Sequence, residues 1–533
     1  MQVQKTQPHN PNFTSAIWAA QALQFLEASP TWGAIAVDIA SMTGPRTIID
    51  FVERGPEIGM ETGIQQGGCT LNFGLMGPYA MLAGLAAAQG INNKYGIKAH
   101  NIFASNDLIT EFGEAFHKQL QNNSKSPVSD TLDEILKNLT AVYENNDFRS
   151  IREDTRKDII RFYNEKLGED KDFLSLNKKD RKEFKEFLRS KIMSETGCEN
   201  GYVLKNAAGK EAVKKISLDA FIDNTIGITE AFKSRHLKAE FGKNIPVSGI
   251  EALNSLNHLA RNRSILGIGF ALIIGLGIQP LNVYLTKKKT GCDGFVGVKG
   301  RSKDKSKEFA AAKTGFAAVA LGLILRNIGK FSELGKNLQF KGPIPTLEQF
   351  KFIYGAAIVS RLLMTRDKDE LREALVRDTV GFVNWLILGG FVTKLTTYWM
   401  DKDKSLIKNA GGGIKDFFKW NLLTRDEVLQ SRLKKLGVKT VENNKALTFK
   451  DLLKKLNEIA SGSGNAAKDA KNIQSQLRKI STAQIAGYAY SCIVLGVLLP
   501  KLNIYMTRKS EEKLQAKLAE EKHHHHHHHK KAA

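Results

Sequence analysis

Two uncharged stretches of about twenty residues each constrain the fold of this chain more than any other feature. They run from Ser264 to Thr286 and from Ile480 to Pro500, and basic residues flank both. A helix of about twenty residues is about 30 Å long, which is the thickness of a bilayer's hydrocarbon core. The sequence therefore predicts a protein that crosses a membrane.

Both stretches lead into nearly the same sequence, LNVYLTKK at 281–288 and LNIYMTRK at 502–509. Aromatic and basic side chains are typical anchors at a membrane interface, because each can place its apolar part in lipid and its polar end in water. This role accounts for the matched residues Tyr284, Lys287, Lys288, Tyr505, Arg508 and Lys509. Part of the similarity therefore needs no explanation beyond a shared membrane interface.

Interfacial anchoring does not explain the other matches, Asn282 with Asn503 and Thr286 with Thr507. A side-chain amide at the end of an apolar segment needs hydrogen-bond partners, which predicts either a helix contact or a polar lining position. Two interpretations stay open at this point. The two segments resemble each other because they end at the same interface, or they are copies of one duplicated unit.

Weaker candidate membrane segments are short, contain or adjoin a charge, or, in the case of 71–93, are uncharged but rich in glycine: 32–43, 71–93, 309–325, 352–364 and 380–399. Apolar runs of ten to fourteen residues also occur as buried or interfacial helices, so these segments need not all span. The expected fold is all-α, a polytopic helical membrane protein with about five to seven membrane segments and polar helical insertions.

Changes in composition along the chain predict five regions. They are a Gly/Ala-rich membrane-associated segment at 1–98 with a possible span at 71–93, a soluble charged helical domain at 99–262, a membrane helix bundle at 263–399, a polar Lys-rich helical linker domain at 400–479, and a last span with a basic tail and His tract at 480–533. Within the soluble domain, Asn177 is a suitable cap for a helix that presents Phe184 and Leu188 on one face and ends at Gly197. No strand alternation is evident there.

Basic residues outnumber acidic ones by 78 to 55, and their location indicates an orientation. The segment 287–307 is a short Lys/Arg-rich loop beside a strong span, so the positive-inside rule predicts that it faces the cytoplasm. Further crossings then return the C-terminus to the cytoplasm and make the repeat parallel. We expect an integral protein of a bacterial inner (plasma) membrane, with basic loops that attract anionic headgroups and with no nucleic-acid partner.

Two patterns lie in residues 50–67. Three glycines at a spacing of four predict either a tight helix contact or a glycine-rich loop: Gly59, Gly63 and Gly67. Four carboxylates have a spacing that would align them on a helix: Asp50, Glu53, Glu57 and Glu61. Because Gly55 and Pro56 interrupt that helix, a solvated face is a better interpretation than a metal or acid–base site.

No sequence motif indicates catalysis, a cofactor or a resident metal. The four cysteines are far apart, and phosphate-loop, zinc-protease and nucleophile-elbow motifs are missing from the sequence. The run His523–His529 is interpreted as an expression tag or a low-complexity tail, because such tracts bind metal without a folded site. We expect a protein without enzymatic activity, cofactor or metal site.

Arg361 is the polar residue that needs an explanation, because it interrupts the run IYGAAIVSRLLM. An arginine at a bilayer centre costs about 2.5 to 3.5 kcal/mol on insertion scales. Thr365 follows closely, so the simpler expectation is that Arg361 reaches the interface. The alternative is an ion pair inside the bundle, with Glu373 or Asp378 as the partner.

Three functions are compatible with these features. The first is a non-enzymatic scaffold or anchoring protein that binds partners, or a second copy of itself, together with anionic lipid; it is favoured by a mean hydropathy of −0.27, which indicates a large polar fraction. The second is a transporter or channel built on a parallel repeat, with Asn282, Asn503 and Arg361 as lining groups. The third and weakest is a pore-forming protein that inserts after it reaches a membrane.

Overall fold

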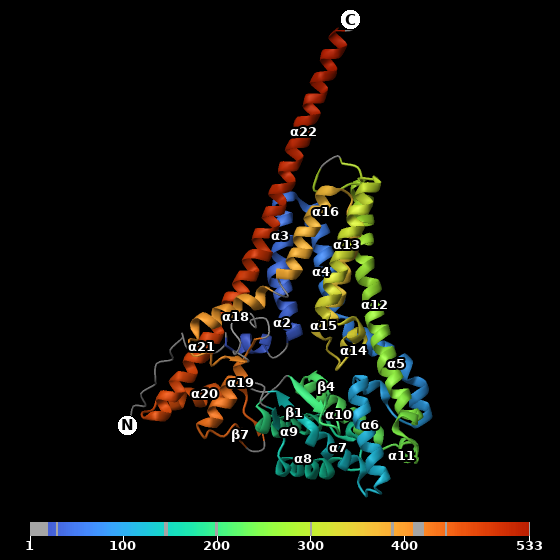
Figure 1. Ribbon diagram of the computed structural model, residues 1–533, viewed down its shortest axis with the longest axis vertical. Coiled ribbons are helices and arrows are strands. Elements are labelled where there is room, and N and C mark those ends of the chain that lie inside the picture. The colour runs from blue at the N-terminus through green and yellow to red at the C-terminus, as the bar shows by residue number, and fades with distance from the viewer. Residues whose placement is uncertain are drawn as a thin grey trace, which may run out of the picture.

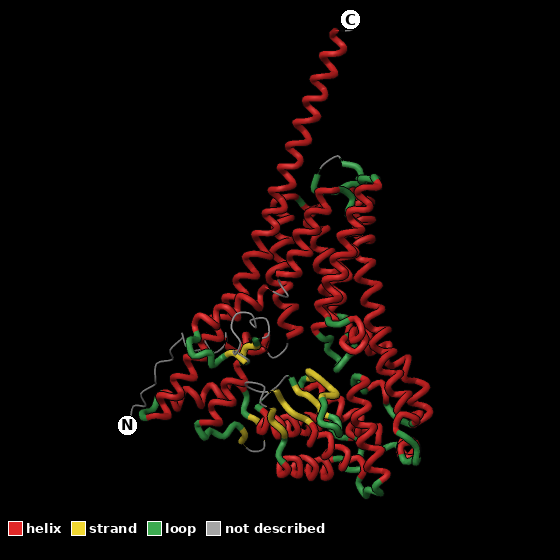
Figure 2. Tube along the Cα trace, in the orientation of Figure 1, coloured by secondary structure: helices red, strands yellow, loops and turns green. Residues whose placement is uncertain are grey.

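The computed structural model describes residues 20–27, 30–142, 148–197, 201–298, 301–384, 388–408, 420–442 and 445–531. It is mostly helical, with 77% helix and few strands. Long helices form an elongated bundle, and two smaller polar regions lie side by side at one end of it (Figure 1, Figure 2). The predicted helical fold is therefore confirmed at this coarse level.

Three helices in the described part of the chain are long and apolar enough to span a membrane: Glu251–Thr290, Lys307–Ile328 and Asn465–Lys517. They contain the predicted segments 264–286, 309–325 and 480–500. A fourth span is possible if Pro56–Gly74 and Met76–Tyr95, which bend by 44° at Leu75, count as one. The predicted total of five to seven spans is not confirmed in the described part of the chain.

The remaining predicted segments differ from straight spans for local reasons. Segment 71–93 contains the bend at Leu75. Segment 352–364 lies in a helix of 18 residues that is buried among its neighbours. Segment 380–399 begins in a π-helical turn and is divided into short pieces, and its residues 385–387 lie outside the described part. Segment 32–43 likewise passes from a short α-helix into a π-helical one.

The bundle contains two helical hairpins. The first consists of α2 (Pro30–Val37), π-helical η1 (Asp38–Thr43), α3 (Gly44–Arg54), α4 (Pro56–Gly74) and α5 (Met76–Tyr95). The second consists of α15 (Leu347–Met364), α16 (Lys368–Ala374), π-helical η7 (Leu375–Val380), α17 (Gly381–Val383) and α18 (Gly389–Met400). In Figure 1 the two hairpins turn at the same end of the bundle, near the labels α3 and α16.

Each hairpin packs against a long helix that comes later in the chain. Helix α12 (Glu251–Thr290) contacts α4 and α15, and the continuous helix formed by α21 (Asn465–Ser491), π-helical η10 (Cys492–Leu498) and α22 (Leu499–Lys531) contacts η1, α3, η7 and α16. Helix α13 (Lys307–Ile328) follows α12 in the sequence and packs on α15. The chain then passes through η6 (Phe331–Glu333) and α14 (Leu334–Asn337) to reach α15. Each long helix therefore contacts both hairpins.

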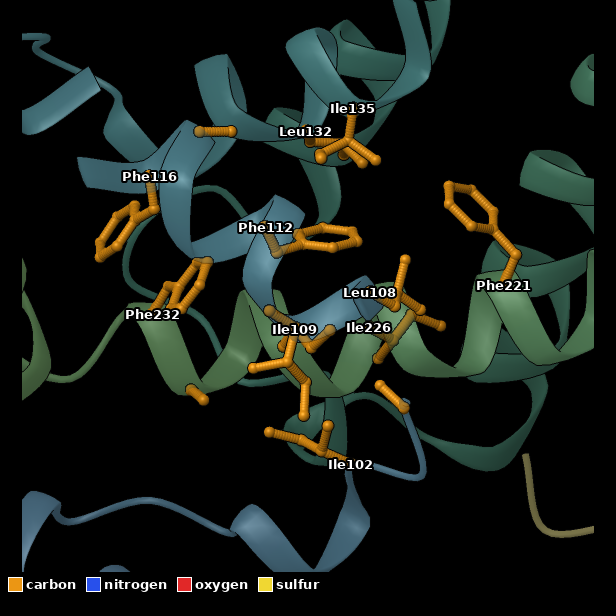
Figure 3. Packing of buried hydrophobic residues seen from close by; sticks show 14 of the residues in the cluster. Ile102, Leu108, Ile109, Phe112, Phe116, Leu132, Ile135, Phe221, Ile226 and Phe232 are labelled. Carbon is orange, nitrogen blue, oxygen red and sulfur yellow. The ribbon is translucent and has the colours of Figure 1, made fainter. Parts of the chain in front are cut away.

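The first polar region follows α5 and has its own hydrophobic core. Its helices are η2 (Ala99–Asn101), α6 (Asn106–Gln121), α7 (Pro127–Asn138), α8 (Glu153–Lys166), η4 (Phe173–Ser175), α9 (Lys178–Thr196), α10 (Leu218–Phe232), α11 (Arg235–Phe241) and η5 (Val247–Gly249). Phe116 and Phe232 stack with ring centroids 4.1 Å apart at the centre of this core (Figure 3). Helix α9 begins after the Asn177 cap and ends at left-handed Gly197, as predicted.

This region also contains a small antiparallel sheet that the sequence did not indicate. The strands β1 (Leu139–Val142), β2 (Phe148–Ser150), β3 (Tyr202–Lys205) and β4 (Glu211–Ile216) pair in the order β2-β1-β3-β4. Tyr202 is fully buried and pairs with Ile216. The expectation of a purely helical domain at 99–262 is therefore wrong in this part, because strands of three to six residues are too short to show an alternating pattern.

The second polar region lies between α18 and the middle of α21. It consists of β5 (Ile407–Lys408), β6 (Asn421–Leu422), α19 (Arg425–Lys435), β7 (Val441–Glu442), β8 (Lys445–Ala446) and α20 (Phe449–Ala460). Apolar side chains from α19, α20 and the first part of α21 form its core. In sequence order, each hairpin is thus followed by a polar region and then by a long helix.

Glu111 on α6 gives the first polar region a pH-dependent stability. Partial burial, together with the nearby Glu114 and Asp107, raises the pKa of Glu111 to about 7. A carboxyl whose pKa is raised by folding stabilises the fold while it is protonated, and this contribution is lost as pH rises through about 7. We expect hydrogen exchange in α6, corrected for intrinsic rates, to be slower at pH 5 than at pH 8, and Glu111→Gln to remove the difference. An equal pH dependence in the variant would contradict this assignment.

Candidate functional site

Asn282 and Thr286 both contact Glu61, which lies on α4. The Asn282 side-chain amide donates to the Glu61 backbone carbonyl at 3.0 Å, and the Thr286 hydroxyl donates to the Glu61 carboxylate at 3.2 Å. Asn282 is buried, and so is Glu61. These two residues of the first repeated segment therefore form a helix contact between α12 and α4.

Asn503 and Thr507 make the same pair of contacts with Glu373, which lies on α16. The Asn503 amide donates to the Glu373 backbone carbonyl at 3.2 Å, and the Thr507 hydroxyl donates to the Glu373 carboxylate. All three residues are buried. The two repeated segments thus contact a glutamate in the same way. Each glutamate lies on the helix that follows the turn of its own hairpin.

Each of these glutamates pairs with an arginine from the other hairpin. Arg54 at the end of α3 donates twice to Glu373, at 2.9 and 2.5 Å, and Arg366 beyond α15 donates to Glu61 at 2.5 Å. Arg54 precedes Glu61 by the same interval in sequence as Arg366 precedes Glu373. We call these the reciprocal ion pairs. They join the two hairpins at the end where the loop 287–307 leaves the bundle.

Five ionisable side chains lie deeper in the bundle, and we call them the mid-depth cluster: Asp38, Arg46, Arg361, Arg377 and Asp378. Two contacts show that this cluster lies at the depth of the two uncharged runs. Ser360, next to Arg361, donates to the carbonyl of Leu276 in the middle of the 264–286 run. Arg46 donates to the carbonyl of Leu495 in the 480–500 run at 3.1 Å. Charged groups at this depth in a membrane protein are costly and usually functional.

Arg361 does not reach the interface, so the simpler expectation for it is not met. It is buried and donates to Asp378, which is also buried, and Arg377 contacts the same carboxylate oxygen of Asp378 at 3.4 Å. Arg377 in turn donates to Gln65 on α4 at 3.1 Å. An ion pair inside the bundle, the alternative from the sequence, describes this geometry.

Three π-helical segments contribute to the mid-depth cluster. Asp38 begins η1, Arg377 and Asp378 belong to η7, and Leu495, whose carbonyl accepts from Arg46, belongs to η10. A π-helical turn displaces backbone carbonyls from the regular helical ladder, and such turns are frequent at functional sites. The backbone is therefore irregular where the buried charges meet.

Several polar atoms of the cluster have no hydrogen-bond partner among the described residues. They are Oδ1 of Asp38, Nη1 of Arg46, Nε of Arg361 and Oδ2 of Asp378, all of them buried. Asp38 accepts from the hydroxyls of Thr70 and Thr43, and among the residues that the structure describes Arg46 donates only to backbone carbonyls. The cluster thus keeps both donor and acceptor atoms without a partner in this part of the chain.

The patterns in residues 50–67 have a different outcome from the one expected. Asp50 and Glu61 are buried, so the carboxylates of this stretch do not form a solvated face, although the helix does break between Arg54 and Pro56 as predicted. A Cβ on Gly59 would lie 2.3 Å from the Phe51 ring, which shows that α3 and α4 pack closely at this glycine. The interfacial residues Tyr284 and Tyr505 are both 60% exposed.

Sequence reasoning missed five members of the site, which are Asp38, Arg46, Arg54, Arg366 and Arg377. The available signal was the occurrence of charges inside apolar, glycine-containing stretches, together with the matching positions of Arg and Glu in RGPEIGME (54–61) and RDKDELRE (366–373). Within the described residues no group of three His, Cys, Asp or Glu side chains could hold a metal ion, and Cys69, Cys292 and Cys492 are free. Comparison with protein-family models, curated proteins and solved structures finds no significant match to this chain.

Proposed function

We propose that this protein is a membrane transporter whose two hairpins move relative to each other around the mid-depth cluster. The observation that carries the proposal is the cluster itself, in which two arginines and two aspartates are buried and Arg377 is half-buried beside the uncharged runs. A helix bundle that only anchors other proteins would be more stable with apolar residues at these positions, because buried ion pairs repay their desolvation poorly. Charges retained there are explained by a charged solute or by protons.

The matched contacts of the two repeated segments support this proposal, in which the chain is built on a parallel internal repeat. Each half would contain a hairpin, a polar insertion and a long helix that ends in the repeated segment, and the reciprocal ion pairs would be the equivalent contacts of the two halves. Transporters built from parallel repeats bind their solute between the halves near the middle of the bilayer. The mid-depth cluster draws Asp38 and Arg46 from the first half and Arg361, Arg377 and Asp378 from the second.

The reciprocal ion pairs would close one end of the pathway. They connect the hairpin ends, so the halves separate there only when both pairs break. On the orientation expected from the basic loop 287–307, this is the cytoplasmic end, with the C-terminus on the same side.

Distances between spin labels test whether the halves move. Labels at Lys287→Cys and Arg508→Cys, in a chain whose native cysteines are replaced, occupy equivalent exposed positions on α12 and α22. We expect Glu61→Gln combined with Glu373→Gln to add a population with a longer distance. A single unchanged distance would support a static scaffold. Uptake of labelled small ions and zwitterions into proteoliposomes, with Asp378→Asn as the inactive comparison, then tests transport directly.

Anchoring of other proteins is the second candidate function. It is favoured by the two polar regions with their own cores, and by the fact that Asn282 and Asn503 contact neighbouring helices instead of sharing one cavity. In this reading the protein is non-enzymatic and its basic loops bind anionic lipid. Crosslinking in native membranes, followed by deletion of residues 97–250, would test it through loss of specific partners. Extraction with carbonate would separate both candidates from a pore-forming protein, which it should release.

A further inference from the structure

A cavity of about 480 Å³ opens between α4 and α12 at the end of the bundle that carries the loop 287–307. Its apolar wall is formed by Met60, Ile64 and Leu285, and its charged rim by Glu57, Lys288 and Lys289. Met60 and Leu285 are 46% and 41% exposed, so the wall is open on one side. The exposed Tyr284 on α12 places this end of the helix at the level of the membrane interface.

The rim offers charges of both signs that the protein itself does not neutralise. The side chains of Glu57, Lys288 and Lys289 make no hydrogen bond or ion pair within the part of the chain that the structure describes. Glu61 behind them is already occupied by Arg366 and Thr286. A ligand at this rim can therefore place an anionic group beside the lysines and a cationic group beside Glu57.

The second hairpin has a carboxylate at the position equivalent to Glu57, and cationic side chains of the protein contact it. Asp369 occupies the position of Glu57 in the matched stretches 54–61 and 366–373. Two cations contact it, Arg372 at 2.8 Å and Arg301 from the loop 287–307. Arg372 is at the position of Met60, so a guanidinium stands where the first hairpin has an apolar side chain. The second hairpin therefore supplies its own cation, whereas the first leaves Glu57 open.

We propose that this cavity binds a phospholipid with a primary ammonium headgroup, of the phosphatidylethanolamine class. The ammonium group lies beside Glu57, the phosphate beside Lys288 and Lys289, and the acyl chains follow Met60, Ile64 and Leu285. A phosphate suits a pair of lysine ammonium groups, and a primary ammonium can donate hydrogen bonds to a carboxylate whereas a trimethylated one cannot. This site does not depend on the transporter proposal.

Thermal unfolding of the delipidated full-length protein tests the site. Added phosphatidylethanolamine should raise the melting temperature by about 2 °C or more, and more than phosphatidylcholine or phosphatidylglycerol with the same acyl chains. Glu57→Gln should abolish the preference for phosphatidylethanolamine over phosphatidylcholine. Lys288→Ala combined with Lys289→Ala should weaken all three lipids. Lys287→Ala is the matched control, because this exposed lysine on the same turn does not line the cavity.

Each other outcome overturns the proposal. An equal response to the three lipids would mean that the headgroup is not recognised. A response to phosphatidylglycerol alone would mean that the lysines bind the anionic headgroup and that Glu57 binds no ammonium group. If Glu57→Gln keeps the full preference, the ammonium group binds elsewhere. If soluble phosphoethanolamine gives the whole effect, the acyl chains contribute nothing and the ligand is not a lipid. Because these residues are at the rim, normal gel-filtration behaviour of each variant verifies that folding is intact.

Discussion

Glu373→Gln is expected to destabilise the bundle by about 3 to 5 kcal/mol, which is the usual cost of removing one partner of a buried ion pair. Glu373 is 4% exposed and accepts two hydrogen bonds from Arg54 and one from Thr507. The glutamine would leave the Arg54 charge buried with only Asp50 nearby, at 3.8 Å. Unfolding by SDS titration in mixed micelles measures the loss.

Two comparisons make this result specific. Glu61→Gln should cost less than Glu373→Gln, because its partner Arg366 keeps an ion pair with Glu370 at 2.6 Å. Glu53→Gln should cost less than about 1 kcal/mol, because Glu53 pairs with Lys501 at 3.7 Å near the surface, where ion pairs contribute little. If Glu373→Gln and Glu53→Gln have the same effect, the reciprocal ion pairs do not hold the hairpins together.

Gly496→Ala is expected to have the second-largest effect, a loss of about 1 to 3 kcal/mol from overpacking. A Cβ at this position would lie 2.6 Å from the backbone oxygen of Ser41 and 3.2 Å from Cβ of Pro45. A backbone atom cannot rotate away as a side chain can, so η10 and η1 must separate. The neighbouring carbonyl of Leu495, which accepts from Arg46, would move with them.

Gly275→Ala is the matched control for this substitution, since Gly275 is the aligned glycine in the first stretch. Its added Cβ would meet Asn72 Nδ2 at 3.4 Å, an ordinary contact distance. We expect little loss of stability there. Melting temperatures of the two purified variants test the difference, and equal losses would show that the close approach of η10 to η1 is not what limits stability.

Local signals in the sequence predicted local features well. The Asn177 cap and Gly197 define α9 because both act within one turn of the helix ends. The uncharged runs 264–286 and 480–500 identified two of the three helices that are long enough to span. The break after Arg54 was visible because Gly55 and Pro56 are adjacent. In each case the physical cause lies within a few neighbouring residues.

The rest of the site depends on contacts between residues that are hundreds of positions apart. Glu61 appeared to belong to a solvated face because its partners, Arg366 and Thr286, come from later helices. Arg361 appeared able to reach water because the sequence of its own helix does not show which other segments cover it. The π-helical turns have no sequence signature of their own. They determine the position of the Leu495 carbonyl, which accepts a hydrogen bond from the Arg46 guanidinium.

The length of α22 gives the second half of the bundle an unusual mechanical property. Beyond Lys509 the helix extends past the other helices (Figure 1), and the part that precedes the His tract, up to Lys522, is about 20 Å long at 1.5 Å per residue. A tilt of about 10° at its base would displace Lys522 by about 3 Å. This part of α22 is thus a lever arm, because a small rotation inside the bundle produces a larger displacement at its far end.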